Sequence, residues 1–163
     1  MRSSHSLVLS FLIFQAVSAA TGYLLARKFG ESLARKFISL GLFGYLVSAL
    51  GAVFLILDIQ LKLGLPAYLF GLATLGFALG VIETLEPSLI SVISKESGPG
   101  RGFGALSSSR SLGLFVGNIV MGLLYQIGAS WSYGYAAIVA TIAAAIVVFT
   151  AKRLKSLSGT IDG

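Results

Sequence analysis

The sequence predicts an all-α fold, a polytopic membrane helical bundle with five transmembrane helices, and three observations support this. Of the 163 residues, 56% are hydrophobic and 11% are charged, whereas about 25% of residues are charged in a typical soluble domain. Five apolar segments have close to, or more than, the roughly 20 residues that a helix needs to cross a bilayer. The short alternating segments of a membrane β-barrel are absent from the sequence, so helices are the expected spans.

The first three expected spans have clear boundary signals. The first, over residues 6–25, is interrupted by Gln15 and by small polar residues. The second, over 37–57, contains no charged residue. The third, over 66–94, begins at Pro66, and proline suits the first turn of a helix. Short polar connections between the spans indicate one membrane domain over the whole chain.

The last two spans follow a stretch that reads as a helix breaker. Residues 95–102 have the sequence KESGPGRG, and Gly-Pro-Gly favours a loop before the fourth span, over 103–127. A tight turn at 128–130 leads to the fifth span, over 131–150. The tail over 152–163 is basic and then polar, and we expect it to be cytoplasmic and disordered.

Lysine and arginine are concentrated at one end of the expected spans. Cytoplasmic loops of membrane proteins carry the excess of these residues. We therefore expect a multi-pass protein of the cell membrane with its N-terminus outside and its C-terminus in the cytoplasm. The nine residues on the predicted cytoplasmic side are Arg27, Lys28, Arg35, Lys36, Lys95, Arg101, Lys152, Arg153 and Lys155, and the two on the other side are Arg2 and Lys62.

The pentapeptide Leu-Ala-Arg-Lys-Phe occurs twice, at residues 25–29 and 33–37, and holds four of the 12 basic residues. We interpret it as a cytoplasmic anchor, because its charges resist translocation and can lie against anionic lipid headgroups. The alternative for the N-terminus is a cleaved signal peptide with an apolar region over 7–15 and a cleavage site at 17–20. Cleavage would place these basic residues on the translocated side, against the charge rule.

Several function classes lack support in the sequence. The net charge of +6 comes from residues between apolar runs and builds no basic face, so we expect no nucleic-acid partner. With no cysteine and one histidine, neither a zinc site nor a cysteine nucleophile is expected. Nucleotide-binding loops and a Ser-His-Asp set are also absent from the sequence. We expect no enzyme activity, no metal and no cofactor.

Three charged residues fall inside the expected spans. A charged group at the bilayer centre costs at least ~2.5–3.5 kcal/mol, so such groups are usually paired or line a wet cavity. Glu83 and Glu86 are three residues apart and share a helical face. Glu86 lies nine residues before Lys95, and Arg110 lies nine residues after Arg101, which places both about 13 Å from the same membrane boundary. We therefore expect a Glu86–Arg110 ion pair.

Glu83 is then the carboxyl group without an obvious partner. One interpretation is a site for proton coupling or cation binding, because a carboxyl group within a membrane can take up and release protons. The other is structural: Glu83 shares Arg110 with Glu86, or hydrogen-bonds a neighbouring helix. Gln15 is a weaker candidate for the wall of a polar cavity, and an interhelical hydrogen bond is its alternative.

Glycines four residues apart recur in the expected spans and predict close helix packing. Gly76 and Gly80 form one such pair in the third span. In the fourth span we expect a packing face made by Gly113, Gly117, Asn118 and Gly122.

The order of three stretches resembles the last five helices of a transporter of the major facilitator superfamily. Residues 22–30 (GYLLARKFG) are similar to the cytoplasmic G-x-x-x-D-R-x-G-R-R loop of that family. Residues 80–90 (GVIETLEPSLI) and then 98–104 (GPGRGFG) resemble its proline-bearing helix and the loop that follows. Residues 109–118 (SRSLGLFVGN) resemble its next, small-residue helix.

The first of these stretches departs from the family pattern. It lacks the aspartate, it is one residue too long, and Glu31 replaces the next basic residue. In the family this loop helps to latch the inward gate. The positions that match the motif here are Gly22, Arg27, Lys28 and Gly30.

The resemblance implies membrane transport of a small-molecule solute. The residues themselves make Glu83 the candidate for a proton-coupling or cation site, with Glu86 and Arg110 as the supporting pair. The family generally has two halves with six helices in each and holds the substrate between them. Five spans fall short of one half, so we expect a homodimer or a complementary transporter half, unless the chain is a truncated product. The alternative is a non-transporting five-span scaffold or partner subunit in the lipid bilayer.

Overall fold

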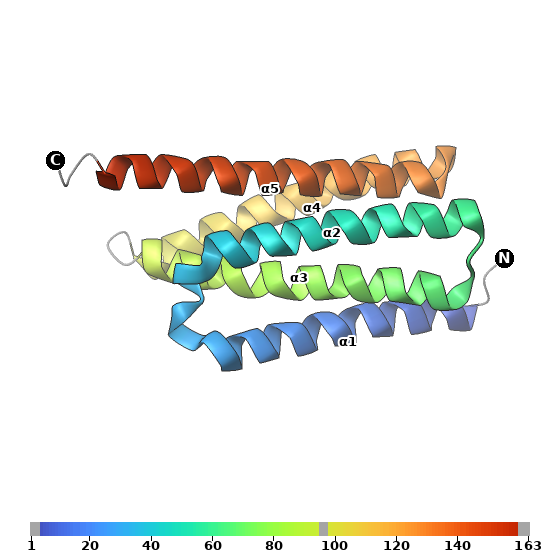
Figure 1. Ribbon diagram of the computed structural model, residues 1–163, viewed down its shortest axis with the longest axis horizontal. Helices are drawn as coiled ribbons and strands as arrows, with labels where there is room; N and C mark the ends of the chain where they lie inside the picture. The colour runs from blue at the N-terminus through green and yellow to red at the C-terminus, as the bar shows by residue number, and fades with distance from the viewer. Residues whose placement is uncertain (1–3, 95–97, 160–163) are drawn as a thin grey trace.

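The computed structural model describes residues 4–94 and 98–159. Over these residues the chain is almost entirely helical and has no strand (Figure 1). Each of the five α-helices in the described part is long and apolar enough to cross a membrane, which confirms the predicted fold class. The elements are α1 (Ser4–Phe29), η1 (Gly30–Ser32), η2 (Ala34–Lys36), α2 (Phe37–Leu61), α3 (Leu65–Ile93), α4 (Pro99–Ile127) and α5 (Ala129–Gly159).

Helix α3 is the centre of the arrangement. It packs against α1, α2 and α4, while α5 packs against α2 and α4. Val81 and Leu85 of α3 are each 1% exposed and form a cluster with Leu33 from the turn between α1 and α2. Two of the three charged residues that the sequence places within spans, Glu83 and Glu86, therefore lie on the helix with the most neighbours.

Helices α1 and α3 approach closely because glycine removes the side chain at the contact. A Cβ atom at Gly76 would lie 2.5 Å from the carbonyl oxygen of Phe14, and one at Gly80 would meet the carbonyl oxygen of Ser18. At Gly22 of α1, an added Cβ would lie 2.9 Å from Oγ1 of Thr84. The predicted packing role of Gly76 and Gly80 is thus confirmed, and small residues let the two backbones meet.

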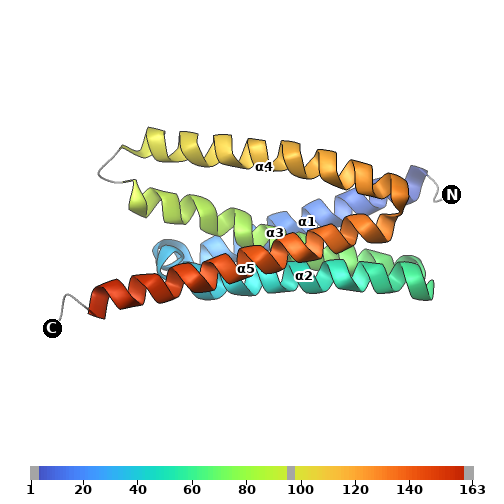
Figure 2. The same ribbon diagram turned by 90° about the horizontal axis from the view of Figure 1, so that it is seen from above.

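Helix α4 is the least covered helix within the described chain. In the most apolar 18 residues of α4 no residue is buried, whereas 28% are buried in the corresponding parts of α2 and α3. Figure 2 shows α4 along one edge of the bundle, on the side away from α2. Oγ of Ser132 in α5 donates a hydrogen bond of 2.9 Å to the carbonyl oxygen of Met121 and so links α5 to α4.

Several helix ends differ from the expected boundaries. Helix α1 continues to Phe29, because the first position with a positive φ is Gly30, at 45°. Helix α2 continues to Leu61 and ends at Lys62, which has left-handed geometry. Helix α4 already begins at Pro99, because proline fits the first turn of a helix and its missing N–H needs no partner there.

The expectation of a disordered tail is wrong for residues 152–159, which continue α5. This stretch contains helix-forming Lys, Arg and Leu and no proline, and its glycine comes only at the end. Residues 160–163, and Arg2 and Lys95 among the residues used to predict orientation, lie outside the described residues.

The glycine contacts predict different responses to the same substitution. Gly76→Ala should lower the free energy of unfolding by about 1–3 kcal/mol, because the new methyl group forces α1 away from α3. Gly113→Ala should change it little in the single chain, because an added Cβ there meets no described neighbouring atom within 4 Å. Thermal unfolding of both variants in detergent micelles checks this. Equal shifts in Tm would contradict the packing described here.

Candidate functional site

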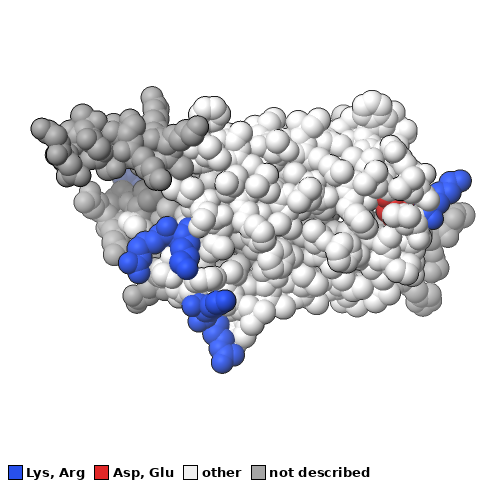
Figure 3. All heavy atoms as spheres, in the orientation of Figure 1, with Lys and Arg blue, Asp and Glu red and all other residues white. Residues whose placement is uncertain are grey.

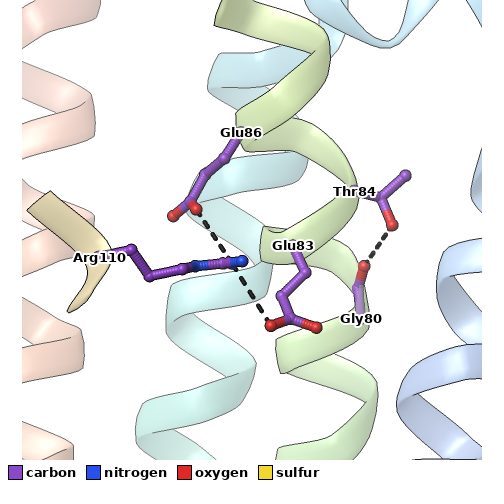
Figure 4. Close-up of polar contacts among 5 residues, drawn as sticks. All are labelled: Gly80, Glu83, Thr84, Glu86 and Arg110. Carbon is purple, nitrogen blue, oxygen red and sulfur yellow. Dashed lines mark hydrogen bonds and ion pairs between the residues drawn. The ribbon is translucent and has the colours of Figure 1, made fainter. Parts of the chain in front are cut away.

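The three charged residues within the spans form one cluster between α3 and α4. Nη2 of Arg110 lies 3.1 Å from Oε2 of Glu86 and 3.4 Å from Oε1 of Glu83. Figure 4 shows the guanidinium group reaching from α4 to both carboxylates on α3. The predicted Glu86–Arg110 ion pair is therefore confirmed, and Glu83 shares the same arginine.

The two carboxylates differ in their surroundings. The side chain of Glu86 is 25% exposed, and that of Glu83 is 44% exposed. Glu86 also has the shorter contact with Arg110. Two carboxylates and one guanidinium carry a formal net charge of −1, and Glu83 is the more accessible of the two negative groups.

The backbone of α3 is altered next to Glu83. Pro87 has no N–H and cannot donate to the carbonyl oxygen of Glu83, four residues earlier. The neighbouring hydroxyl groups bond within the helix: Thr84 donates to the carbonyl oxygen of Gly80 at 2.7 Å, and Ser88 donates to that of Thr84 at 2.9 Å. The turn that carries Glu83 thus contains a backbone carbonyl without its usual helical donor and two hydroxyl groups, in a largely apolar helix.

A pocket of about 250 Å³ lies between α1 and α3, and Glu83 is one of its walls. Among the described residues, Glu83 is the one charged residue in its lining. Two of the lining positions are glycines at the close contact of α1 and α3, where an added Cβ would meet atoms of the facing helix. The lining residues are Gln15, Ser18, Ala19 and Gly22 from α1, with Gly80, Glu83 and Thr84 from α3.

Glu83 therefore belongs both to the ion cluster and to the pocket. It contacts Arg110 of α4 and lines a space whose other wall is α1. Glu83 lies nine residues before Val92, where the span ends, which corresponds to about 13–14 Å along the helix. The site lies well within the part of the chain that can cross the membrane.

The structure brings some of the sequence-predicted residues together and leaves others apart. Gln15, considered earlier for a cavity wall, lines the pocket with Glu83. Gly22 also lines it, whereas Arg27 and Lys28 lie in the last turn of α1 and Gly30 opens the turn that follows.

The glycine face predicted on α4 lies outside both the pocket and the ion cluster. An added Cβ at Gly113, Gly117 or Gly122 meets no described neighbouring atom within 4 Å, and Asn118 is exposed. A packing role for these residues stays a prediction, because within the described chain no helix covers them.

Ser18 and Thr84 were missed as pocket residues. Small hydroxyl side chains are common in membrane helices and hydrogen-bond their own backbone, so the sequence carries little signal for them. Asp58 follows the expected end of the second span at residue 57, but it lies in α2 and is 3% exposed. Among the described residues, no group of three or more His, Cys, Asp or Glu side chains could hold a metal ion.

The fold and this cluster define a class, an α-helical membrane protein with an ion-paired polar site inside its spans. The family model of the Major Facilitator Superfamily matches residues 2–161. The chain therefore belongs to this family, whose members are membrane transporters and not enzymes. The searches of curated proteins and of solved structures found no match.

The shared arginine predicts energetic coupling across α3 and α4. Arg110→Gln should lower Tm, because two carboxylates within the membrane then lack their cation. Adding Glu86→Gln should restore part of the loss, with a coupling energy of about 0.5–3 kcal/mol. Thermal unfolding of the two single variants and the double variant measures this energy, with Lys62→Gln as a control outside the cluster. Strictly additive effects would contradict the ion pair.

Proposed function

We propose that the chain moves a small solute across the membrane as part of a proton-coupled transporter, with Glu83 as the coupling residue. The observation that carries this proposal is the double position of Glu83, which contacts Arg110 on one side and lines the α1–α3 pocket on the other. A solute that binds in the pocket would contact Glu83 and could thereby change its contact with Arg110. Transport itself follows from the family, and the role of Glu83 is the new element.

The charge of the cluster supports proton coupling. With Glu83, Glu86 and Arg110 all ionised, its formal charge is −1, and an uncompensated charge is unfavourable inside a membrane. One proton on a carboxylate makes the cluster neutral. We assign the coupling role to Glu83 on geometric grounds, because its side chain is the more exposed of the two and lines the pocket. Protonation would then release Glu83 from Arg110 and leave the Glu86–Arg110 pair.

A second copy of the chain, or a complementary half, supplies the other wall of the transport path in this proposal. Transporters of this family hold their substrate at the interface of two halves. Apolar residues and glycines of α4 are uncovered within the described chain, including Leu112, Phe115 and Gly113. Such a surface is what a further membrane helix would cover by close packing.

We also propose the orientation that the basic residues predict. Arg27, Lys28, Arg35 and Lys36 are exposed at one end of the spans, so this end would face the cytoplasm of the cell membrane. Helix α2 begins at this end, and α3, α4 and α5 each run in the reverse direction of the helix before them. The C-terminal end of α5 would therefore lie on the same side.

The uncovered face of α4 also suits a second candidate function, a membrane scaffold or partner subunit without transport activity. Such a protein would need the exposed glycines for docking but would not need the pocket or the proton acceptor. The two candidates therefore differ in their response to changes at Glu83.

Substitution of Glu83 tests the proposal. In proteoliposomes with an imposed pH gradient, a panel of radiolabelled amines, sugars and amino acids first identifies a transported solute. Glu83→Gln should then reduce gradient-driven accumulation at least tenfold and retain solute counterflow, because glutamine mimics the protonated acid but releases no proton. Lys62→Gln is the control. Unchanged accumulation by Glu83→Gln would overturn proton coupling, and absence of transport by the intact assembly would favour the scaffold.

A further inference from the structure

The two copies of Leu-Ala-Arg-Lys-Phe place equivalent side chains in equivalent surroundings. The first copy is the last turn of α1, and the second forms η2 and the start of α2. The leucine and phenylalanine of each copy belong to one apolar cluster with α3: Leu25, Phe29, Leu33 and Phe37 around Val81 and Leu85. The arginine and lysine of each copy are exposed. We call the set of Arg27, Lys28, Arg35 and Lys36 the basic corner.

The basic corner is organised around a single aromatic ring. Nζ of Lys36 lies 4.3 Å from the ring centroid of Phe29, and Nζ of Lys28 lies 5.7 Å from it. The two ammonium groups are therefore no more than about 10 Å apart, and each gains a cation–π contact. The ring links the first copy of the pentapeptide to the second.

The turn that joins the copies is fixed to the bundle. Leu33 is 3% exposed and packs against Val81 and Leu85 of α3. Its backbone N–H donates to the carbonyl oxygen of Gly30 at 3.2 Å, and Oγ of Ser32 donates to that of Phe29 at 2.7 Å. The four cations thus project from a turn with little freedom, which lowers the entropy lost when they bind a common ligand.

The basic corner lies between two candidate membrane spans. The first ends at Phe29 and the second begins at Phe37, so we expect the turn at the membrane boundary, at the level of the phospholipid headgroups. Figure 3 shows basic side chains at the ends of the molecule, with an uncharged surface between them on this face. One turn toward the membrane centre, Tyr23 is 65% exposed and Leu24 is 60% exposed. Cations next to exposed apolar side chains match a phosphate group attached to acyl chains.

We propose that the basic corner is a binding site for the headgroup of an anionic phospholipid. Two arginines can each donate two hydrogen bonds to phosphate oxygens, and two lysines add point charges. The stretch over 25–37 has four basic residues and one acidic residue, Glu31, so a net positive charge remains. A soluble anion would use the cations alone, whereas a lipid also covers the apolar side chains that flank them.

Native mass spectrometry of the purified protein with added phosphatidylglycerol or phosphatidylcholine tests this site. The intact protein should retain phosphatidylglycerol in preference to phosphatidylcholine. Lys28→Gln with Lys36→Gln should weaken binding roughly 25-fold, since each cation near an anionic headgroup contributes roughly fivefold. Lys62→Gln with Arg101→Gln removes the same charge from other exposed positions and should change affinity less than twofold. Lys28→Arg with Lys36→Arg should retain binding.

Three results would overturn the proposal. Equal binding of the two lipids would remove the headgroup preference. An equal loss in the Lys62 and Arg101 variant would assign the effect to net charge and not to the corner. Competition by free glycerol phosphate at the same concentration as the lipid would identify a soluble-anion site in place of a lipid site. None of these readouts depends on transport.

Discussion

The free-energy cost of an ionised side chain inside a bilayer is the constraint on which the structure depends. It requires Arg110 of α4 to turn toward the carboxylates of α3. This ion-paired contact sets which face of α4 meets the bundle, and thereby which face stays uncovered. Because one arginine meets two carboxylates, it also leaves a negative charge that a proton can neutralise. The proposed proton coupling and the proposed further helix thus have one physical origin.

The pocket depends on a second constraint, the close approach of α1 and α3. Gly76 and Gly80 place the backbone of α3 against carbonyl oxygens of α1. Gly22 and Gly80 also line the pocket beside Glu83, so the close contact of the two helices forms part of the pocket wall. About one turn further along α1, the doubled pentapeptide holds the turn with its leucines and phenylalanines and leaves its cations exposed.

The sequence predicted the spans and the Glu86–Arg110 pair because both depend on helix rise and hydropathy, which are local properties. It could not place Gln15 beside Glu83, since that contact arises from the packing of two helices far apart in the chain. We expected Pro99 in a loop, but it occupies the first turn of α4. Proline is compatible with a loop and with a first helical turn, so the sequence does not distinguish the two. Asp58 follows the expected end of the second span, because a charged residue usually marks a span boundary, but it lies in α2 and is buried.

The mass of the purified protein in nanodiscs, corrected for bound lipid, tests the central claim most directly. This claim is that α4 presents a face which another membrane helix covers in the functional assembly. We expect a stable assembly with a second copy or with a co-purifying partner of complementary apolar helices. A single chain that remains monomeric and folded at every accessible protein concentration, with no partner retained from the native membrane, would contradict it.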